Sequence, residues 1–304
     1  MSAGKILVVR GGAIGDFVLT LPVFAALREQ FPAAQIEVLG YPHIAGLART
    51  GALVDEVRSI EARSLAPFFA RSGILDQELQ HYFGSFAIII SYLYDPDGIF
   101  HANVARCSKA QFIAGPHRPD ERGSIPASEV FLRPLERLAI YGADTIPKLA
   151  VSPKEPREPD TFLLAVHPGS GSPQKNWPEE KWLELLRRVA ALPKVRLLLV
   201  GGEAELDRLA RLHRELPNER TELVQNLSLV DLGSRLANCD LFVGHDSGIT
   251  HLAAAVGTSA LALWGESNLQ VWAPQGSKAK VIRHHRGLAE LEVERVWEDV
   301  WACL

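Results

Sequence analysis

The chain alternates strand-like and helix-like segments along almost its whole length of 304 residues. Short apolar runs such as KILVVR, at residues 5–10, are typical of buried parallel strands. Segments with apolar residues at helical spacing lie between these runs. Because two parallel strands need a helix-length crossover between them, the alternation predicts an α/β protein with parallel sheets covered by helices.

The alternation falls into two sets, separated by residues 146–161. This segment contains four prolines and several charges and lacks apolar periodicity, which is typical of a linker. Before it we expect a longer helix over residues 130–143 and strands near residues 5–10, 35–41, 55–60, 86–93 and 111–115. After it we expect an amphipathic helix at the end of the chain and strands near residues 162–169, 195–202, 222–227, 240–244 and 259–265. The pattern predicts two Rossmann-like domains facing across a cleft.

Composition excludes several classes of protein. The net charge of −4 gives no electrostatic footprint for nucleic acid. The longest apolar runs are strand-length, and the start of the chain lacks the long hydrophobic block of a signal peptide. The three cysteines (Cys107, Cys239 and Cys303) have no paired spacing, which argues against a disulfide framework or a zinc site. We therefore expect a cytoplasmic protein.

The segment HPGSGSPQKNWP, from His167, follows an expected strand and precedes a helix that begins near Pro178. Its glycines and serines offer backbone N–H groups and hydroxyls, and Lys175 offers a cation. The positive end of the helix dipole adds to these, so the segment is suited to a pyrophosphate. A polar loop with an ordinary helix cap is an equally good interpretation of the composition.

The segment GHDSGITHLAAAVG, from Gly244, has the same strand-to-helix form. Either Asp246 or Ser247 would cap the helix, whose first amides suit a phosphate. Asp246 would repel a phosphate, so we expect it to cap the helix or to bind sugar hydroxyls. His251 lies one turn into the helix, where packing is the commoner role of a lone histidine. The spacing of His245, Asp246 and His251 differs from H-E-x-x-H and argues against a metal.

A third strand, at residues 195–202, ends in two glycines, and Glu203 and Glu205 follow. A carboxylate at this position could accept hydrogen bonds from ribose hydroxyls. Acidic residues are also common in the first turn of a helix for the dipole alone. The second half therefore carries a candidate site for a nucleoside diphosphate.

In the first half, GGAIGD places Gly11, Gly12, Gly15 and Asp16 on a strand-to-helix turn. The segment is not a G-x-G-x-x-G dinucleotide motif, because Arg10 occupies the first glycine position. A lone carboxylate at this turn suits a general base that takes a proton from an acceptor hydroxyl. Capping of the following helix explains it equally well.

Three segments together resemble glycosyltransferase family 9, the ADP-heptose:lipopolysaccharide heptosyltransferases. They read GDFVLTLPVFAALRE, HPGSGSPQKNWPEEKW and FVGHDSGITHLAAAVGTSALALWG. The resemblance implies a GT-B fold with an acceptor-binding domain at residues 1–150 and a nucleotide-sugar-binding domain at residues 160–287. It implies that the final helix, 288–304, packs back on the N-terminal domain. It also implies inverting transfer of heptose from ADP-heptose to a glycan or glycolipid acceptor, with no metal or other cofactor.

The resemblance also implies a role for each matching residue. Asp16 corresponds to the catalytic base, and Gly11, Gly12 and Gly15 form the loop beside acceptor or phosphate. The donor-binding residues are then Ser170, Gly171, Lys175, Glu203 or Glu205, Asp246, Ser247, Gly248 and His251. The chain departs from the family after LALWG, where Glu266 and Ser267 replace proline and threonine of G-P-T-D-P. This change leaves the donor sugar open.

The acceptors of the family are commonly anionic, whereas charges in the N-terminal half are nearly balanced. Some local basicity exists at Arg106, Lys109, Arg118 and Arg122, for which a solvated surface loop is the simpler explanation. We expect at most peripheral contact with the inner face of the cytoplasmic membrane. The alternatives are a GT-B nucleotide-sugar epimerase or hydrolase and a non-catalytic nucleotide-binding protein.

Overall fold

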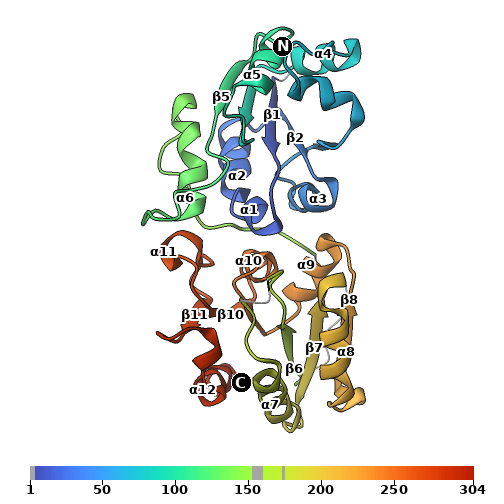
Figure 1. Ribbon diagram of the computed structural model, residues 1–304, viewed down its shortest axis with the longest axis vertical. Helices are drawn as coiled ribbons and strands as arrows, with labels where there is room; N and C mark the ends of the chain where they lie inside the picture. Colours follow the sequence, from blue (N-terminus) through green and yellow to red (C-terminus); the bar gives the residue numbers. More distant parts are fainter. Residues whose placement is uncertain (1–3, 153–159, 173–174) are drawn as a thin grey trace. The chain divides into compact units, whose positions relative to one another are not determined.

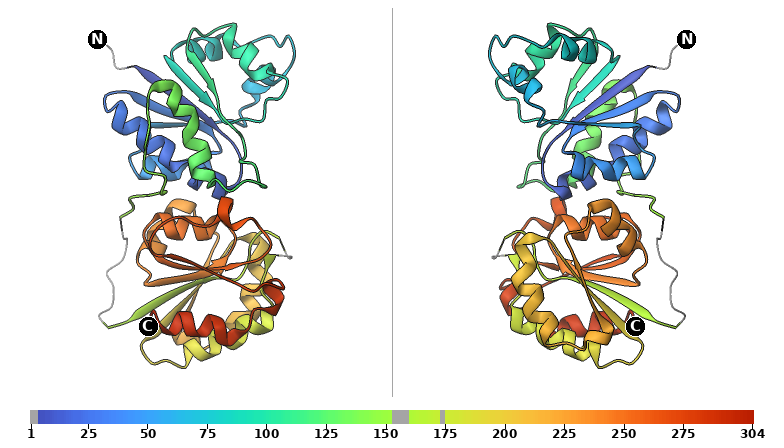
Figure 2. Two further views of the ribbon diagram at one scale, coloured as in Figure 1. Left: turned by 90° about the vertical axis from the view of Figure 1, so that its left-hand side faces the viewer. Right: turned by 90° about the vertical axis from the view of Figure 1, so that its right-hand side faces the viewer.

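The computed structural model describes residues 4–152, 160–172 and 175–304. The chain divides into two compact units, Met1–Thr145 and Ile146–Leu304. Each unit has a parallel sheet with helices on both faces (Figures 1 and 2). The predicted α/β class with two Rossmann-like domains is therefore confirmed.

The first unit contains a five-stranded parallel sheet in the order β3-β2-β1-β4-β5. Its strands are β1 (Lys5–Arg10), β2 (Gln35–Gly40), β3 (Glu56–Ser59), β4 (Ile88–Ser91) and β5 (Gln111–Ala114). The helices are α1 (Ile14–Val18), α2 (Leu21–Gln30), α3 (Pro42–Thr50), α4 (Gln77–Gly84), α5 (Ile99–Ala105) and α6 (Ala127–Leu132), with shorter 3₁₀ turns η1 (Arg63–Phe69) and η2 (Arg133–Leu138).

Strand β1 is the centre of this sheet and is buried from Ile6 onward. It pairs with β2 on one side and with β4 on the other, and the register sets Val9 opposite both Leu39 and Ser91. The strand order reverses direction between β1 and β4. In open parallel sheets, ligands bind outside the carboxyl ends of the strands at such a switch point. The turn that contains Asp16 directly follows β1 and therefore lies at this point.

The second unit contains a six-stranded parallel sheet in the order β11-β10-β9-β6-β7-β8. Its strands are β6 (Phe162–His167), β7 (Val195–Gly201), β8 (Thr221–Gln225), β9 (Leu241–His245), β10 (Ser259–Trp264) and β11 (Ala279–Arg283). The helices are α7 (Glu179–Ala190), α8 (Leu206–Arg214), α9 (Leu229–Ala237), α10 (Gly248–Ala255), α11 (Leu269–Trp272) and α12 (Val293–Trp301), and η4 (Glu203–Glu205) precedes α8. The switch point of this sheet lies between β6 and β9.

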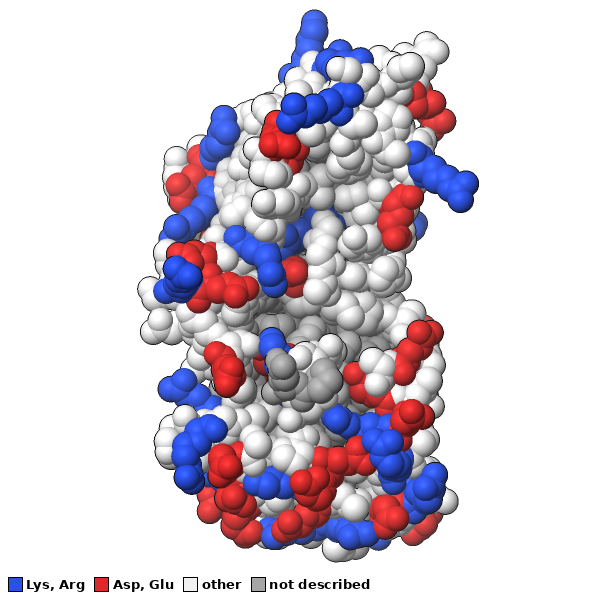
Figure 3. All heavy atoms as spheres, in the orientation of Figure 1, with Lys and Arg blue, Asp and Glu red and all other residues white. Residues whose placement is uncertain are grey.

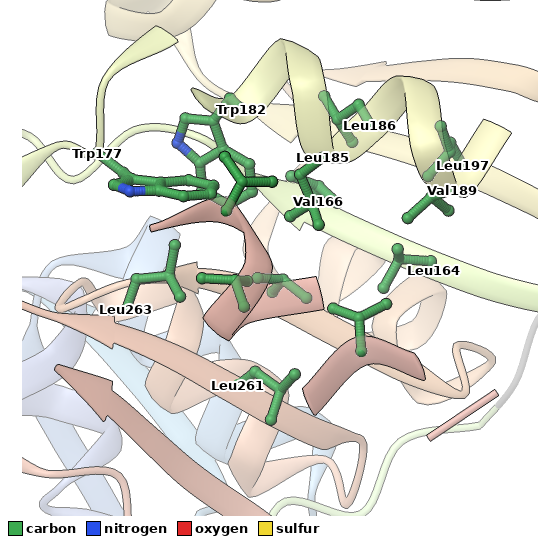
Figure 4. Close-up of a cluster of buried hydrophobic side chains, with 14 of the residues drawn as sticks. Leu164, Val166, Trp177, Trp182, Leu185, Leu186, Val189, Leu197, Leu261 and Leu263 are labelled. Carbon is green, nitrogen blue, oxygen red and sulfur yellow. The ribbon is translucent and has the colours of Figure 1, made fainter. Parts of the chain in front are cut away.

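A large apolar core fills one side of the second sheet (Figure 4). Trp177 and Trp182 are fully buried and meet edge to face, with ring centroids 5.2 Å apart. The apolar stripe of α7, which includes Leu185 and Leu186, packs with them over β6 and β10. Burial of such aromatic and aliphatic side chains stabilises the unit by about 1.5–3 kcal/mol per side chain. The loop between β6 and α7 is thus anchored to the core at its Trp177 end.

The C-terminal helix corrects one expectation. The family resemblance implies that residues 288–304 pack on the N-terminal domain, whereas the structure assigns them to the second unit. Helix α12 lies beside α7 (Figure 1), and its apolar side chains Val293, Val296 and Val300 belong to the core of the second unit. The physical reason is that the apolar stripe of α12 completes this core.

Three further differences concern element boundaries. The helix expected over residues 130–143 ends at Leu138, because Pro134 converts its second half into the 3₁₀ turn η2. Strand β11 was missed. In the linker expected at residues 146–161, residues 153–159 lie outside the described residues. The preceding part already belongs to the second unit, where Leu149 is buried and its N–H donates to the carbonyl of Ala255 (2.8 Å).

Candidate functional site

Asp16 lies in the first turn of α1, three residues after the N-cap residue Ala13. Its Oδ2 accepts a hydrogen bond from the N–H of Ala13 (3.1 Å), so the helix-capping interpretation is correct as far as this oxygen goes. The side chain is 15% exposed, and Oδ1 lies 3.9 Å from Nη2 of Arg10, beyond hydrogen-bond distance. Oδ2 therefore caps the first turn of α1, and Oδ1 lies near the guanidinium of Arg10.

The glycines of this turn permit that geometry. Gly12 has a left-handed backbone with φ of +102°, and a Cβ there would lie 3.0 Å from Oδ2 of Asp16. A side chain at this position would be strained and would crowd the carboxylate. Gly11 leaves room beside Tyr41 and Leu93, and Gly15 lies inside α1.

Arg10 is the residue of this region whose role sequence reasoning missed. Its side chain is 1% exposed and donates from Nη2 to the backbone carbonyl of Asp16 (3.1 Å) and from Nη1 to the carbonyl of His117 (2.9 Å). The guanidinium lies over the rings of Tyr92 and Phe131, with its Cζ 5.6 and 4.4 Å from their centroids. Burial lowers the pKa of Arg10, and the neighbouring Asp16 and Tyr92 oppose this effect. The signal in the sequence that could have indicated a role for Arg10 is an arginine that ends a strand of otherwise apolar residues.

The four basic residues noted in the first half do not form one cluster at this edge. Arg106 and Lys109 precede β5 and therefore lie toward the amino ends of the strands, the opposite edge from Asp16. Arg106 donates to the carbonyl of Gly73 (2.8 Å). Arg118 and Arg122 follow β5, on the edge that carries Asp16, and the exposed Arg118 pairs with Glu121 (3.7 Å).

In the second unit, the loop after β6 and the start of α10 meet at the switch point. Nζ of Lys175 lies 2.6 Å from Oδ2 of Asp246, which directly precedes the helix. Ser247 is the N-cap residue, and its side chain accepts from the N–H of Thr250 (3.4 Å). Of the two residues that could cap this helix, Ser247 is therefore the cap. Asp246 pairs with the lysine instead.

Four further residues of the predicted donor site belong to the same loop and the same helix. Ser170 donates from its hydroxyl to the carbonyl of Ser172 (2.8 Å), and Gly171 has a left-handed φ of +70°. Gly248 begins α10. His251 is buried within the same helix, one turn after Ser247, which agrees with a packing role.

Of the two glutamates that follow β7, the structure distinguishes Glu205 from Glu203. Glu205 is buried, and its Oε2 accepts from the N–H of Gly202 (3.0 Å), whereas Glu203 is exposed. A Cβ on Gly169 would lie only 2.3 Å from the side chain of Glu205, so this carboxylate directly underlies the loop after β6. Of the two glutamates, Glu205 is therefore the one whose side chain lies against the loop after β6.

Two buried histidines lie under the same loop. His167 has its Nε2 4.0 Å from Oε2 of Glu205, and burial lowers its pKa to about 4, although Glu205 acts in the opposite direction. His245 is fully buried, and burial lowers its pKa to about 3. Both rings are therefore neutral at pH 7.

The altered segment after β10 lies at the same edge of the sheet. The indole N–H of Trp264 donates to the carbonyl of Ser267 (2.8 Å), and Asn268 caps α11 through the N–H of Gln270 (3.0 Å). Glu266 is exposed. The segment is thus an ordered turn beside the end of β9.

Charges of both signs are mixed over one face of the second unit. Lys and Arg side chains are interspersed with Asp and Glu over the face seen in Figure 3. Within residues 4–152, 160–172 and 175–304, no three His, Cys, Asp or Glu side chains converge in a way that could hold a metal ion. In the same residues, no helix has the length and apolar character needed to cross a bilayer.

Comparison with known proteins places this site in a family. A model of glycosyltransferase family 9 (heptosyltransferase) matches residues 138–300, more than half of the chain. Lipopolysaccharide heptosyltransferase 1 of Pseudomonas aeruginosa is 32% identical over 133 residues, which cover 44% of this chain and 35% of the relative. Lipooligosaccharide heptosyltransferase 2 of Haemophilus influenzae is 30% identical over 169 residues, or 49% of each chain. The chain is thus matched to half or less of the length of these relatives.

Solved structures extend the likeness to the whole fold. A glycosyl transferase family 9 protein of Veillonella parvula superposes with a TM-score of 0.81 at 17% identity, covering 100% of this chain and 98% of the other. The ADP-heptose lps heptosyltransferase II of E. coli superposes with a TM-score of 0.77 at 19% identity, covering 98% of both chains. An E. coli heptosyltransferase with ADP gives 0.74 at 18% identity, covering 99% and 100%. Together with the family match, these comparisons show that the chain belongs to glycosyltransferase family 9 and has the GT-B fold.

Proposed function

We propose that this protein transfers a heptose from ADP-heptose to a hydroxyl of a lipopolysaccharide core or related glycan acceptor, with inversion and without a metal ion. The proposal is supported by the family match and by relatives named as lipopolysaccharide heptosyltransferases. It is also supported by the structural neighbour solved with ADP.

The observation that carries the proposal is the position of Lys175. Its ammonium lies at the switch point of the second sheet, beside the first turn of α10. A lysine and the amides of a helix N-terminus together stabilise a pyrophosphate. Negative charge on the pyrophosphate grows as the bond to the sugar breaks. These groups therefore stabilise the transition state more than the bound donor, which accelerates transfer.

Asp16 supplies the base in this proposal. Its Oδ2 is fixed by the N–H of Ala13, which orients the carboxylate, while Oδ1 makes no hydrogen bond to Arg10. Oδ1 takes the proton from the acceptor hydroxyl as that oxygen attacks the anomeric carbon. The carbon–oxygen bond to the new acceptor forms while the bond to ADP breaks, and ADP leaves with the electron pair.

The test is a transfer assay with purified protein and ADP-heptose, UDP-glucose or GDP-mannose in separate reactions. Each is run with and without truncated lipopolysaccharide, and nucleotide release and sugar transfer are followed by mass spectrometry. ADP release that requires acceptor and adds a heptose to it is the expected result. Release without acceptor would instead indicate an epimerase or hydrolase, and no turnover with tight ADP binding would indicate a nucleotide-binding protein.

Two variants separate the proposed roles. Asp16→Asn should lower turnover by about 10²- to 10⁴-fold, the usual contribution of a general base, and leave ADP affinity unchanged. The matched control is Asp76→Asn, since Asp76 caps α4 through the N–H of Leu79 (3.0 Å). Lys175→Ala should weaken ADP binding as well as turnover. Normal turnover in Asp16→Asn, or unchanged ADP affinity in Lys175→Ala, would contradict the respective assignment.

A further inference from the structure

His245 connects the two ends of the loop that follows β6. Strands β6 and β9 are neighbours, and their register sets His167 opposite Gly244. The next residue along β9 is His245, which therefore lies beside the point where the loop leaves β6. Its side chain has no exposed surface.

The imidazole bonds to both limbs of this loop. Nδ1 lies 3.1 Å from the carbonyl of Gly169, and Nε2 accepts from the N–H of Trp177 (2.8 Å). A carbonyl can only accept a hydrogen bond and a peptide N–H can only donate one. Both bonds therefore form only when the ring is neutral and carries its proton on Nδ1.

The surroundings of the ring favour this state. Burial is the largest influence and lowers the pKa of His245; the hydrogen bond to Gly169 acts in the opposite direction, and the facing groups His167 and Arg208 lower the pKa further. The ring meets the indole of Trp182 edge to face at 5.3 Å, and the backbone carbonyl of His245 accepts a hydrogen bond from the hydroxyl of Thr250. The imidazole is therefore held in place from several sides.

The far limb of the loop is fixed independently of the histidine. The indole N–H of Trp177 donates to the carbonyl of Leu291 (2.9 Å), within the second unit. Between the two bonded residues lie Ser170 and Lys175, which belong to the predicted phosphate site. Asp246, the neighbour of His245, holds Lys175 at 2.6 Å. Two consecutive residues thus hold this loop. His245, the last residue of β9, bonds to its backbone, and Asp246, which follows, pairs with Lys175.

We propose that His245 is a positioning residue: its imidazole fixes the backbone of Gly169 and Trp177, and so positions the neighbouring Ser170 and Lys175 for the pyrophosphate of the donor. The inference rests on the proposed function, because that function assigns the pyrophosphate to this loop. His245 itself does not touch the nucleotide. Loss of the imidazole removes one bond from each limb; Trp177 keeps its bond to Leu291, whereas Gly169 is released, so that nucleotide binding must then fix Gly169 as well.

The experiment compares three substitutions in the full-length protein by calorimetric titration with ADP. His245→Asn retains a donor for Gly169, His245→Gln retains an acceptor for Trp177, and His245→Ala retains neither. The alanine variant should bind ADP about 10- to 100-fold more weakly, as expected for two lost buried hydrogen bonds, and the two amide variants should lie between it and the wild type. In the transfer assay, the KM for donor should rise more than kcat falls.

The matched control is His213→Gln. His213 also bonds to a backbone carbonyl of the second unit, that of Thr221 (3.2 Å), but it lies on α8 away from the loop. This variant should bind ADP as the wild type does. A folded His245→Ala protein with wild-type affinity for ADP would overturn the inference. A wild type that fails to bind ADP would instead reject the proposed function.

A spectroscopic measurement decides the matter if the alanine variant does not fold. In protein labelled with ¹⁵N-histidine, the signals of His245 are identified as those lost in His245→Asn or His245→Gln. A neutral ring with its proton on Nδ1, unchanged from pH 8 to pH 5, supports the two hydrogen bonds to Gly169 and Trp177. A proton on Nε2, or titration of the ring in this range, excludes the two hydrogen bonds and overturns the inference.

Discussion

The two buried histidines predict a steep loss of stability in acid, confined to the second unit. The pKa of His167 is lowered to about 4 and that of His245 to about 3, whereas a histidine of the unfolded chain titrates near 6.5. The folded state therefore stays unprotonated at these rings while the unfolded state binds two protons. By linkage, this contribution to stability is present above pH 6.5 and is lost as the pH falls, down to about 4 for His167 and about 3 for His245.

The size of the effect follows from the number of protons. Each group that binds a proton only on unfolding lowers the free energy of unfolding by about 1.36 kcal/mol per pH unit, so two such histidines lower it by about 2.7 kcal/mol per pH unit. The free energy of unfolding should fall at nearly this rate between pH 6 and pH 4.5. A whole domain is stabilised by only about 5–15 kcal/mol, so the loss of about 4 kcal/mol over this range is a large part of the stability of the second unit.

Urea unfolding followed by tryptophan fluorescence measures this slope directly. All six tryptophans of the chain lie after residue 176, so the signal reports the second unit alone. His167→Gln and His245→Gln should each remove about half of the slope, whatever their effect on stability at pH 8. His213→Gln is the control. An unchanged slope in the double variant would refute the argument that these rings are buried neutral.

Three further predictions concern the candidate site. Arg10→Met should reduce turnover at least about tenfold without changing ADP affinity, because it removes a charged hydrogen bond to the backbone of the proposed base, Asp16. Arg10→Lys should restore part of the rate. Gly169→Ala should weaken ADP binding and lower the melting temperature, since its Cβ would meet Glu205 at 2.3 Å, whereas Gly265→Ala, with nothing within 4 Å, should do neither. Asp246→Asn should slow sugar transfer, since it weakens the proposed contact to the sugar and the ion pair that holds Lys175; a wild-type transfer rate would contradict this role.

The fold could be predicted from the sequence because its signals are local. Apolar runs of strand length, helical periodicity between them and a proline-rich break each depend on a few consecutive residues. The missed strand β11 is at the edge of its sheet and has only one buried residue, Ile282, so its apolar pattern is weak. The final helix was expected on the wrong unit because amphipathicity shows that a helix has an apolar face, but not which core that face completes.

Some residues of the candidate site could be predicted from the sequence, because they are polar or charged residues that directly follow a predicted strand. Lys175, Ser247 and Asp246 follow strands β6 and β9, and parallel pairing brings those ends together. The choice between Glu203 and Glu205 could not be made in this way. It depends on the backbone path through η4, which buries Glu205 beneath Gly169 and leaves Glu203 in solvent.

Arg10 and His245 show what the sequence could not reveal. Each lies at the last position of a central strand, β1 or β9, and each sends a buried polar side chain to backbone groups of a neighbouring loop. The switch point is where two adjacent crossovers leave the sheet in opposite directions, so the loops there lose the support of a neighbouring strand. A side chain that bonds to loop backbone can supply this support, and it acts through carbonyl and N–H groups that every residue has. The partners of such a side chain therefore cannot be recognised from the sequence, whereas its position at the end of a central strand can.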